Sequence, residues 1–162
     1  MLDKFFKGDS CVLFAYGITN AGKTHTIQGE QNEPGILPRL VNALLEKIQL
    51  SSAKSSDLKI SMLEIYQEKL YDLLGKKQEK LAIRDGNGRV EVVNLSSHSI
   101  TSSKEAFKLL TKAAAKRSKG HTLLNSDSSR SHAMYTITLN SDDQSSDGAM
   151  IQVIDLAGAE RA

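Results

Sequence analysis

Hydrophobic and polar positions along the chain follow two different periods, and this predicts strands interleaved with helices. Apolar residues run without interruption over Cys11–Tyr16 and stop at Gly17, which predicts a strand buried on both faces. Apolar and polar residues alternate well enough over Leu58–Tyr66, His132–Asn140 and Ala149–Asp155 to predict three further strands. A helix is expected directly after the first strand.

Two segments carry apolar residues at the spacing of an amphipathic helix. The first, GILPRLVNALLEKIQ, covers residues 35–49, and its Pro38 is compatible with a first helical turn. The second begins where Ser102 and Glu105 have the spacing of a capping box, and it should stop near Gly120. Each segment therefore predicts a helix with one apolar face.

Short polar and glycine-containing stretches separate these elements. Residues 67–75, QEKLYDLLG, are interpreted as a helical turn closed by Gly75. Asp85–Gly88 lies between LAIR and RVEVV, and because Gly and Asn tolerate a positive φ, a hairpin of two short strands is predicted. SSAKSSD and SDDQSSDG have the composition of loops. Strands alternating with helices, plus one hairpin, predict an α/β domain with a mixed central sheet flanked by helices.

Size and composition fit one globular domain, because the chain has 162 residues, of which 40% are hydrophobic and 25% charged. Lys plus Arg number 21 and Asp plus Glu number 19, so the net charge of +2 gives no reason to expect nucleic acid or a membrane as partner. No apolar run approaches the roughly 20 residues of a membrane span, and the N-terminus lacks the features of a signal peptide. A single cysteine, Cys11, excludes an internal disulfide and favours a reducing compartment such as the cytosol.

One segment matches a phosphate-binding motif. Residues 17–24, GITNAGKT, fit G-x-x-x-x-G-K-[ST] at every fixed position, directly after a predicted strand and before a predicted helix. In such a loop, here called the P-loop, glycines let the backbone curl so that its N–H groups converge on phosphate oxygens. Lys23 is expected to reach the β- and γ-phosphates, Thr24 to bind Mg²⁺, and Asn20 to adopt a left-handed conformation. The expected nucleotide-binding residues of the loop are Gly17, Ile18, Thr19, Asn20, Ala21, Gly22, Lys23 and Thr24.

Two later segments could complete a site for nucleotide hydrolysis, which also needs a metal-binding acid and a sensor of the γ-phosphate. IQVID is an apolar strand that ends in Asp155, an acid that can hold Mg²⁺ through water. In the LAGAE that follows, Gly158 could present its N–H to a γ-phosphate, although the same residues could be an ordinary helix N-terminus. NSDSSRSH, residues 125–132, places serines and one arginine before a strand, and by itself it could be a plain polar loop. For the P-loop, the alternative is a strand-to-helix turn that matches by chance.

Together these segments resemble the kinesin motor domain. The resemblance rests on FAYGITNAGKTHT, SMLEIYQEKLYDLL, NSDSSRSH and DLAGAE, which occur in the order and at about the spacing of that family. The last two resemble its switch I and switch II motifs. The resemblance implies a P-loop NTPase fold, an ATPase that uses ATP and Mg²⁺, coupling to microtubules (tubulin), and a location in the cytoplasm on the microtubule cytoskeleton.

The resemblance also implies roles for single residues. Ser128 and Ser129 would contact the γ-phosphate and Mg²⁺, while Arg130 and Glu160 would form a salt bridge that closes the site around the attacking water. His25 aligns with the residue that stacks on adenine, and a solvent-facing helix histidine is the alternative. The implied catalytic residues are Ser129, Arg130, Gly158 and Glu160. The implied metal-binding residues are Thr24, Ser129 and Asp155.

The resemblance covers nearly the whole chain but only about the central half of a motor domain of that family. It implies that residues 1–162 are a partial motor domain, without the N-terminal strand, the C-terminal microtubule-binding helices and the neck linker. Without the strands that normally lie beside it, Cys11–Tyr16 would be an exposed apolar edge. Asn20 stands where the family usually has Gly, and Ala159 where it usually has Ser; neither difference removes a phosphate or metal ligand.

Three hypotheses follow. The favoured one is the ATP-binding and ATP-hydrolysing core of a kinesin-like microtubule motor, which the order of the motifs supports. The second is a truncated, non-motile kinesin that binds nucleotide and acts as a regulatory module. The third is an unrelated P-loop NTPase, which NSDSSRSH and DLAGAE together argue against.

Overall fold

The computed structural model describes residues 1–30, 32–50, 58–75, 80–86, 89–119, 128–139 and 148–160. They form an eight-stranded sheet in the order β1-β8-β7-β2-β3-β4-β5, with β6 paired to β2 beside this path. The strands are β1 (Cys11–Ala15), β2 (Leu58–Tyr66), β3 (Lys69–Asp72), β4 (Lys80–Gly86), β5 (Arg89–Val93), β6 (His98–Ser99), β7 (Ser131–Leu139) and β8 (Met150–Asp155). The helices are α1 (Leu2–Phe5), α2 (Lys23–Gln28), α3 (Ile36–Leu50) and α4 (Ser103–Lys119), with a short 3₁₀ helix at Ser128–Arg130.

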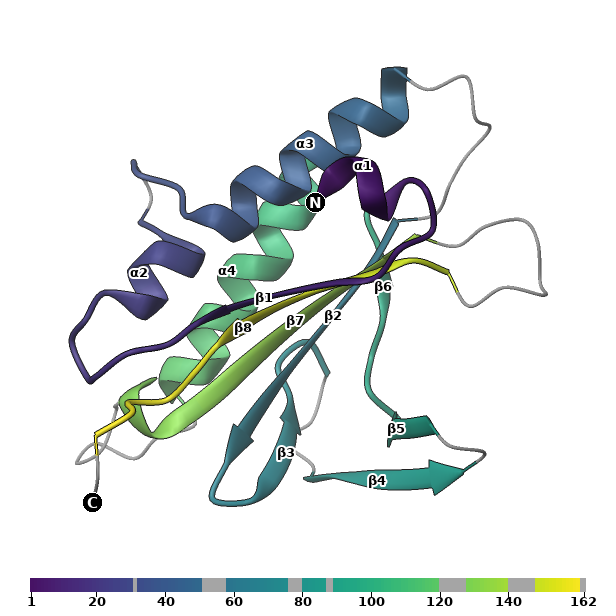
Figure 1. The fold of residues 1–162 in the computed structure, drawn as a ribbon. Helices are drawn as coiled ribbons and strands as arrows, with labels where there is room; N and C mark the ends of the chain where they lie inside the picture. The colour runs from purple at the N-terminus through teal and green to yellow at the C-terminus, as the bar shows by residue number, and fades with distance from the viewer. Residues whose placement is uncertain are drawn as a thin grey trace.

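The core lies between one face of the sheet and the pair of helices α3 and α4, which Figure 1 shows lying against it. Alternate strand residues point into this core in register. Ile60 of β2 pairs with Ile137 of β7, which pairs in turn with Ile151 of β8, and all three side chains are fully buried. Burial of such a side chain stabilises the fold by about 1.5–3 kcal/mol. From α3 the buried side chains are Leu37, Leu40, Val41, Leu44 and Leu45.

Most of the predicted elements are confirmed, and with them the α/β class and the mixed sheet. β1 runs parallel to β8, whereas the other strand pairs are antiparallel. Strands were predicted at the positions of β1, β2, β7 and β8, and helices at those of α2, α3 and α4. The hairpin is also confirmed, since β4 pairs with β5 and projects away from the helices in Figure 1. The short helix α1 was not predicted from the sequence.

The prediction that Cys11–Tyr16 is buried on both faces is wrong. β1 pairs only with β8 among the described strands, so it forms the edge of the sheet. One face packs on the core, but Val12 and Phe14 on the other face are 56% and 60% exposed, and Tyr16 is exposed as well. A continuous apolar run does not distinguish a central strand from an edge strand. The expectation of an exposed apolar edge, drawn from the resemblance, is confirmed.

The helical turn predicted for residues 67–75 is also wrong. Lys69–Asp72 forms β3, which pairs antiparallel with β2 in a tight hairpin. The two turn residues, Gln67 and Glu68, have φ values of 49° and 60°. Such left-handed pairs suit a two-residue hairpin loop but are usually Asn or Gly, so this turn lacks the usual sequence signal.

The start of α4 has half of its predicted capping box. The N–H of Glu105 donates to Ser102 Oγ at 3.3 Å, as expected, but the Glu105 carboxylate accepts mainly from the N–H and hydroxyl of Thr101. These bonds from Thr101 lower the pKa of Glu105.

Of the helices within the described ranges, none is both long and apolar enough to cross a bilayer.

Some predicted features lie outside the described residues. They are the loops at 51–57 and 141–147, the turn residues Asn87 and Gly88, the helix end at Gly120, and residues 125–127 of the switch I segment.

Candidate functional site

The P-loop lies where two parallel strands end. Ala15 of β1 pairs with Asp155 of β8, so the P-loop and the switch II segment (residues 155–160) leave the sheet side by side. Between β1 and α2 the backbone turns through left-handed conformations at Asn20, with φ 63°, and Gly22, with φ 81°. The predicted conformation of Asn20 is therefore confirmed, and Asn is one of the residues that tolerate it.

The two polar residues that begin α2 face the loop and the strand end. The Lys23 amine donates to the carbonyl oxygens of Gly17 and Ile18 at 2.8 and 2.7 Å, so it lies over the P-loop. The Thr24 hydroxyl donates to Asp155 Oδ2 at 2.8 Å. This bond joins the start of α2 to the end of β8 and brings together two of the predicted metal-binding residues.

Asp155 is the most deeply buried acid of the site, with 1% of its surface exposed. Arg117 of α4 donates to its Oδ2 at 2.6 Å and to the Ser131 carbonyl at 3.0 Å, and it lies 3.6 Å from a Glu64 carboxylate oxygen. The other carboxylate oxygen, Asp155 Oδ1, is buried without a hydrogen-bond partner. An unpaired anionic oxygen beside the Thr24 hydroxyl fits a hard divalent cation such as Mg²⁺, held directly or through water.

Arg117 and Glu64 are not among the predicted site residues, although the resemblance places Arg117 at a usual polar position of the helix before switch I. A signal for Arg117 was available, because it follows Ala106, Leu110 and Ala113 on the inner side of α4 and so places an arginine on an apolar stripe. A charged side chain in that position needs a buried partner.

The switch I and switch II segments meet at the P-loop through backbone hydrogen bonds. The N–H of Gly158 donates to the Ser129 carbonyl at 2.6 Å, and the N–H of Ala159 donates to the Gly17 carbonyl at 3.1 Å. His132 Nδ1 accepts from the N–H of Ala157 at 3.1 Å, which assigns the ring proton to Nε2 when the imidazole is neutral. The three segments singled out in the sequence therefore lie around one position in the fold.

Six residues of the P-loop and switch I, together with His25, line one cavity of about 280 Å³. They are Thr19, Asn20, Gly22, Lys23, Thr24, His25 and Ser129. Two further predicted residues lie in the same segments, Ala21 in the P-loop and Ser128 in the 3₁₀ helix. His25 Nε2 lies 3.9 Å from a carboxylate oxygen of Glu33, and its side chain is 49% exposed. That position at the rim is open to a planar ligand group, and the adenine-stacking role of His25 stays a prediction.

Glu160 lies against the P-loop. One carboxylate oxygen accepts from the backbone N–H of Thr19 at 3.0 Å, and the other accepts from the Thr19 hydroxyl. These hydrogen bonds, with a smaller contribution from the Lys23 charge, lower the pKa of Glu160. Because Thr19 holds this carboxylate, Glu160 is not engaged with Arg130, whose side chain is exposed. The predicted Arg130–Glu160 salt bridge stays a prediction.

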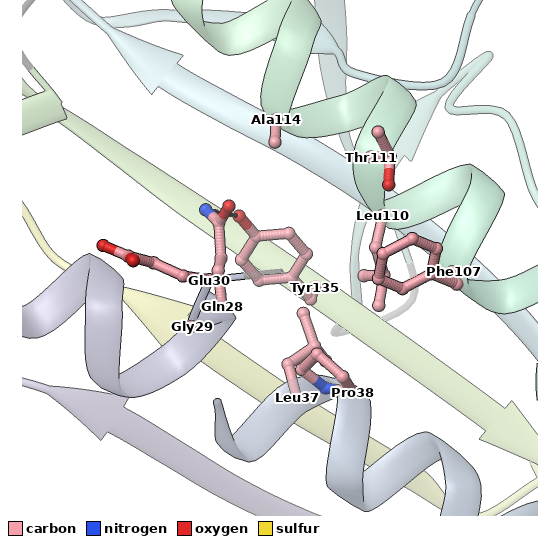
Figure 2. Close-up of a pocket in the computed structure, with 10 residues that line it drawn as sticks. All are labelled: Gln28, Gly29, Glu30, Leu37, Pro38, Phe107, Leu110, Thr111, Ala114 and Tyr135. Carbon is pink, nitrogen blue, oxygen red and sulfur yellow. Dashed lines mark hydrogen bonds between the residues drawn. The ribbon is translucent and has the colours of Figure 1, made fainter. Parts of the chain in front are cut away.

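A second cavity of about 390 Å³ lies between α4 and the start of α3. Figure 2 shows Phe107 and Leu110 on one side of it and Leu37 and Pro38 on the other. At its floor, the Gln28 side-chain amide donates to the hydroxyl of Tyr135 at 2.7 Å, and burial raises the pKa of that hydroxyl to about 12. The lining is mainly apolar and includes none of the predicted site residues, so this cavity is separate from the P-loop site.

Comparisons with known proteins identify one family. The family model for the kinesin motor domain matches residues 1–162. The chain is 38% identical to the kinesin-like protein tea2 of Schizosaccharomyces pombe, a match that covers 97% of this chain and 26% of that protein. It is also 38% identical to human kinesin-like protein KIF18B, over 100% of this chain and 20% of that one. With kinesin-like protein KIN-5A of Arabidopsis thaliana the identity is 34%, over 94% and 17%.

One solved structure has a fold similar to that of this chain. It is described as a fast kinesin, with implications for ATPase mechanism and interactions with microtubules, and it superposes with a TM-score of 0.87 at 29% sequence identity. The match covers 99% of this chain and 48% of that structure. The chain thus spans about half of the solved structure and no more than about a quarter of the three relatives.

Proposed function

The chain belongs to the kinesin motor domain family, and from this premise we propose that its P-loop, switch I and switch II segments form an ATP- and Mg²⁺-binding site that hydrolyses ATP in a microtubule motor. The observation that carries the proposal is the hydrogen bond of 2.8 Å between Thr24 and Asp155. It brings the two residues suited to a nucleotide-bound metal together at the end of the sheet, beside the amine of Lys23.

The binding roles follow from the donors that surround the cavity. The N–H groups of residues 17–24 and the Lys23 amine hold the phosphates, with Lys23 exchanging its carbonyl partners for phosphate oxygens. His25 stacks on the base at the open rim. Ser128 and Ser129 contact the terminal phosphate in this proposal, which is supported by Ser129 lining the cavity and by the hydrogen bond from the Gly158 N–H to its carbonyl.

Thr24, Asp155 and Ser129 are the residues that would hold Mg²⁺. Mg²⁺ supplies charge neutralisation on the phosphate oxygens when it is bound. Asp155 is suited to this role because Arg117 and Thr24 fix one carboxylate oxygen while the other has no hydrogen-bond partner. A carboxylate held in this way needs little rearrangement to bind a cation or its water.

The catalytic residues act through two arrangements of the switch segments. In the structure, the Gly158 N–H is bonded to Ser129 and the Glu160 carboxylate to Thr19. When the terminal phosphate is present, the Gly158 N–H donates to it and Glu160 pairs with Arg130, which orients the attacking water. The loss of the terminal phosphate reverses both changes, so the switch segments report the state of the nucleotide.

We infer that residues 1–162 are part of a motor domain, spanning the P-loop strand to switch II, and that the complete protein acts on microtubules in the cytoplasm. The solved kinesin structure described above, which is reported with implications for interactions with microtubules, supports this partner. The alternative of a non-motile regulatory module has less support, because the chain keeps the P-loop, the strand-end acid and both switch motifs.

Substitution of the P-loop lysine tests the nucleotide site. Lys23→Ala is expected to weaken binding of ATP with Mg²⁺ by about 10- to 100-fold, since hydrogen bonds to a charged group are lost. Isothermal titration calorimetry measures the affinity, and release of inorganic phosphate measures hydrolysis. Lys108→Ala is the matched control, because Lys108 is exposed on α4. Equal ATP affinity in the two variants would contradict the proposed site.

A further inference from the structure

Glu160 occupies the position in the P-loop that an anion would take. Its two carboxylate oxygens accept from the backbone N–H and the hydroxyl of Thr19, in the middle of the phosphate-binding motif. Backbone N–H groups of such loops are the groups that phosphate oxygens use. A carboxylate that takes this donor therefore excludes a phosphate oxygen from it.

The backbone that leads into Glu160 is anchored by two hydrogen bonds. The Gly158 N–H is bonded to Ser129 and the Ala159 N–H to Gly17, so the two residues before Glu160 are anchored across the P-loop. A Cβ at Gly158 would meet the Thr19 hydroxyl and the Glu160 carboxylate, so a side chain there would displace the contact between them. The glycine thus lets the carboxylate approach the loop.

Lys23 takes part in the same closed arrangement. Its amine is turned onto the carbonyl oxygens of Gly17 and Ile18, which lie on the loop beside Thr19. Its positive charge also favours the ionised form of Glu160. Lys23, which the proposed function assigns to phosphate binding, and Glu160, which it assigns to catalysis, are therefore both bonded to the P-loop itself.

We propose that Glu160 is an intramolecular competitor for the P-loop, which nucleotide phosphates must displace before they can bind there. This inference rests on the proposed function and adds a second role to Glu160, beside its pairing with Arg130. Entry of the phosphate releases the carboxylate from Thr19, and the released carboxylate is then free to reach Arg130. Phosphate binding and movement of the switch II segment are thereby one event.

Nucleotide cannot bind while Glu160 occupies the P-loop. The apparent affinity is therefore the affinity of the open loop multiplied by the fraction of time that the loop is open. If the contact is formed about nine-tenths of the time, the apparent affinity is about tenfold weaker than that of the open loop. A purely catalytic glutamate has no such effect, because removing it changes turnover and leaves binding unchanged.

The test is the affinity of Glu160→Gln for nucleotide, measured by isothermal titration calorimetry with ADP and with a non-hydrolysable ATP analogue, each with Mg²⁺. Gln keeps the shape of the side chain and removes its charge. We expect binding about tenfold tighter than that of the unsubstituted chain. Glu33→Gln is the matched control, because it removes one negative charge at the rim, 3.9 Å from His25, without touching Thr19. It is expected to change affinity less than twofold or so.

Three results would be decisive. Equal affinities for the unsubstituted chain and Glu160→Gln overturn this inference and leave the proposed function standing. Equal gains in Glu160→Gln and Glu33→Gln also overturn it, because the effect is then one of general charge. If neither the unsubstituted chain nor Glu160→Gln binds nucleotide, the proposed function fails and the inference with it.

Hydrogen exchange at the Thr19 amide gives a second measurement that does not depend on nucleotide. The amide should exchange slowly in the unsubstituted chain and several-fold faster in Glu160→Gln, and Glu33→Gln should leave it slow. Identical exchange in all three proteins would show that Glu160 does not protect the Thr19 amide, and would overturn the inference.

Discussion

Among single residues, Asp155 is the one on which the proposed site depends most. It is buried, it accepts from both Thr24 and Arg117 through one oxygen, and its other oxygen has no hydrogen-bond partner. Arg117 supplies the positive charge that makes this burial tolerable, and it also neutralises Glu64. Stability and the proposed metal binding should therefore be coupled at one carboxylate.

Removal of Arg117 tests this coupling. Arg117→Leu leaves Asp155 and Glu64 without their buried cation, and loss of one partner of a buried ion pair costs about 3 kcal/mol or more of unfolding free energy. Urea unfolding measures the change. Lys108→Leu, on the exposed side of the same helix, should stay within about 0.5 kcal/mol of the unsubstituted chain. Similar losses in both variants would contradict the role of Arg117.

Among the elements, the junction after β3 shows how one side chain joins distant segments. The Asp72 carboxylate accepts from the N–H groups of Leu74 and Gly75 and from the N–H and hydroxyl of Ser96, which precedes β6. Lys116 of α4 donates to the Asp72 carbonyl at 2.6 Å. This residue therefore ties the end of β3 to α4 and to the chain that leads into β6.

The stability of this junction should depend on pH. Burial raises the pKa of Asp72, but hydrogen bonds from Ser96, Leu74 and Gly75 outweigh it and hold the pKa below its ordinary value. A lowered folded-state pKa stabilises the protein above the unfolded-state pKa of about 4, and this stability is lost as the pH falls through the folded-state pKa. Asp72→Asn should thus lose less unfolding free energy between about pH 5 and pH 2 than the unsubstituted chain.

Urea unfolding at several pH values measures this difference. Asp9→Asn is the control, because Asp9 is exposed. A pH dependence of Asp72→Asn equal to that of Asp9→Asn would show that the carboxylate makes no special contribution.

Local sequence patterns predicted most elements because period and capping are local properties. They missed β3 because its turn, Gln67–Glu68, adopts positive φ without Gly or Asn. They misjudged β1 because exposure depends on which strands lie beside it. The P-loop and Asp155 were found from motifs, but the bonds of Arg117 to Asp155 and of Glu160 to Thr19 join residues 38 and 141 positions apart. Such pairs are set by the tertiary fold.

In the molecule as a whole, the sheet brings distant segments to one end. β1 and β8 end side by side, and the 3₁₀ helix before β7 lies against the chain that follows β8. At the edge of the sheet, in contrast, the apolar side chains of Val12 and Phe14 of β1 are exposed. The same strand therefore positions the P-loop and leaves one apolar face uncovered by the described residues.

Hydrogen exchange with and without ATP and Mg²⁺ shows whether the three segments close around one nucleotide. Nucleotide should slow exchange together in residues 17–24, 128–132 and 156–160, while exchange in the β4–β5 hairpin stays unchanged. Lys23→Ala should lose this protection in all three segments. Protection confined to the apolar cavity between α3 and α4, or slowing in the P-loop alone, would contradict the account.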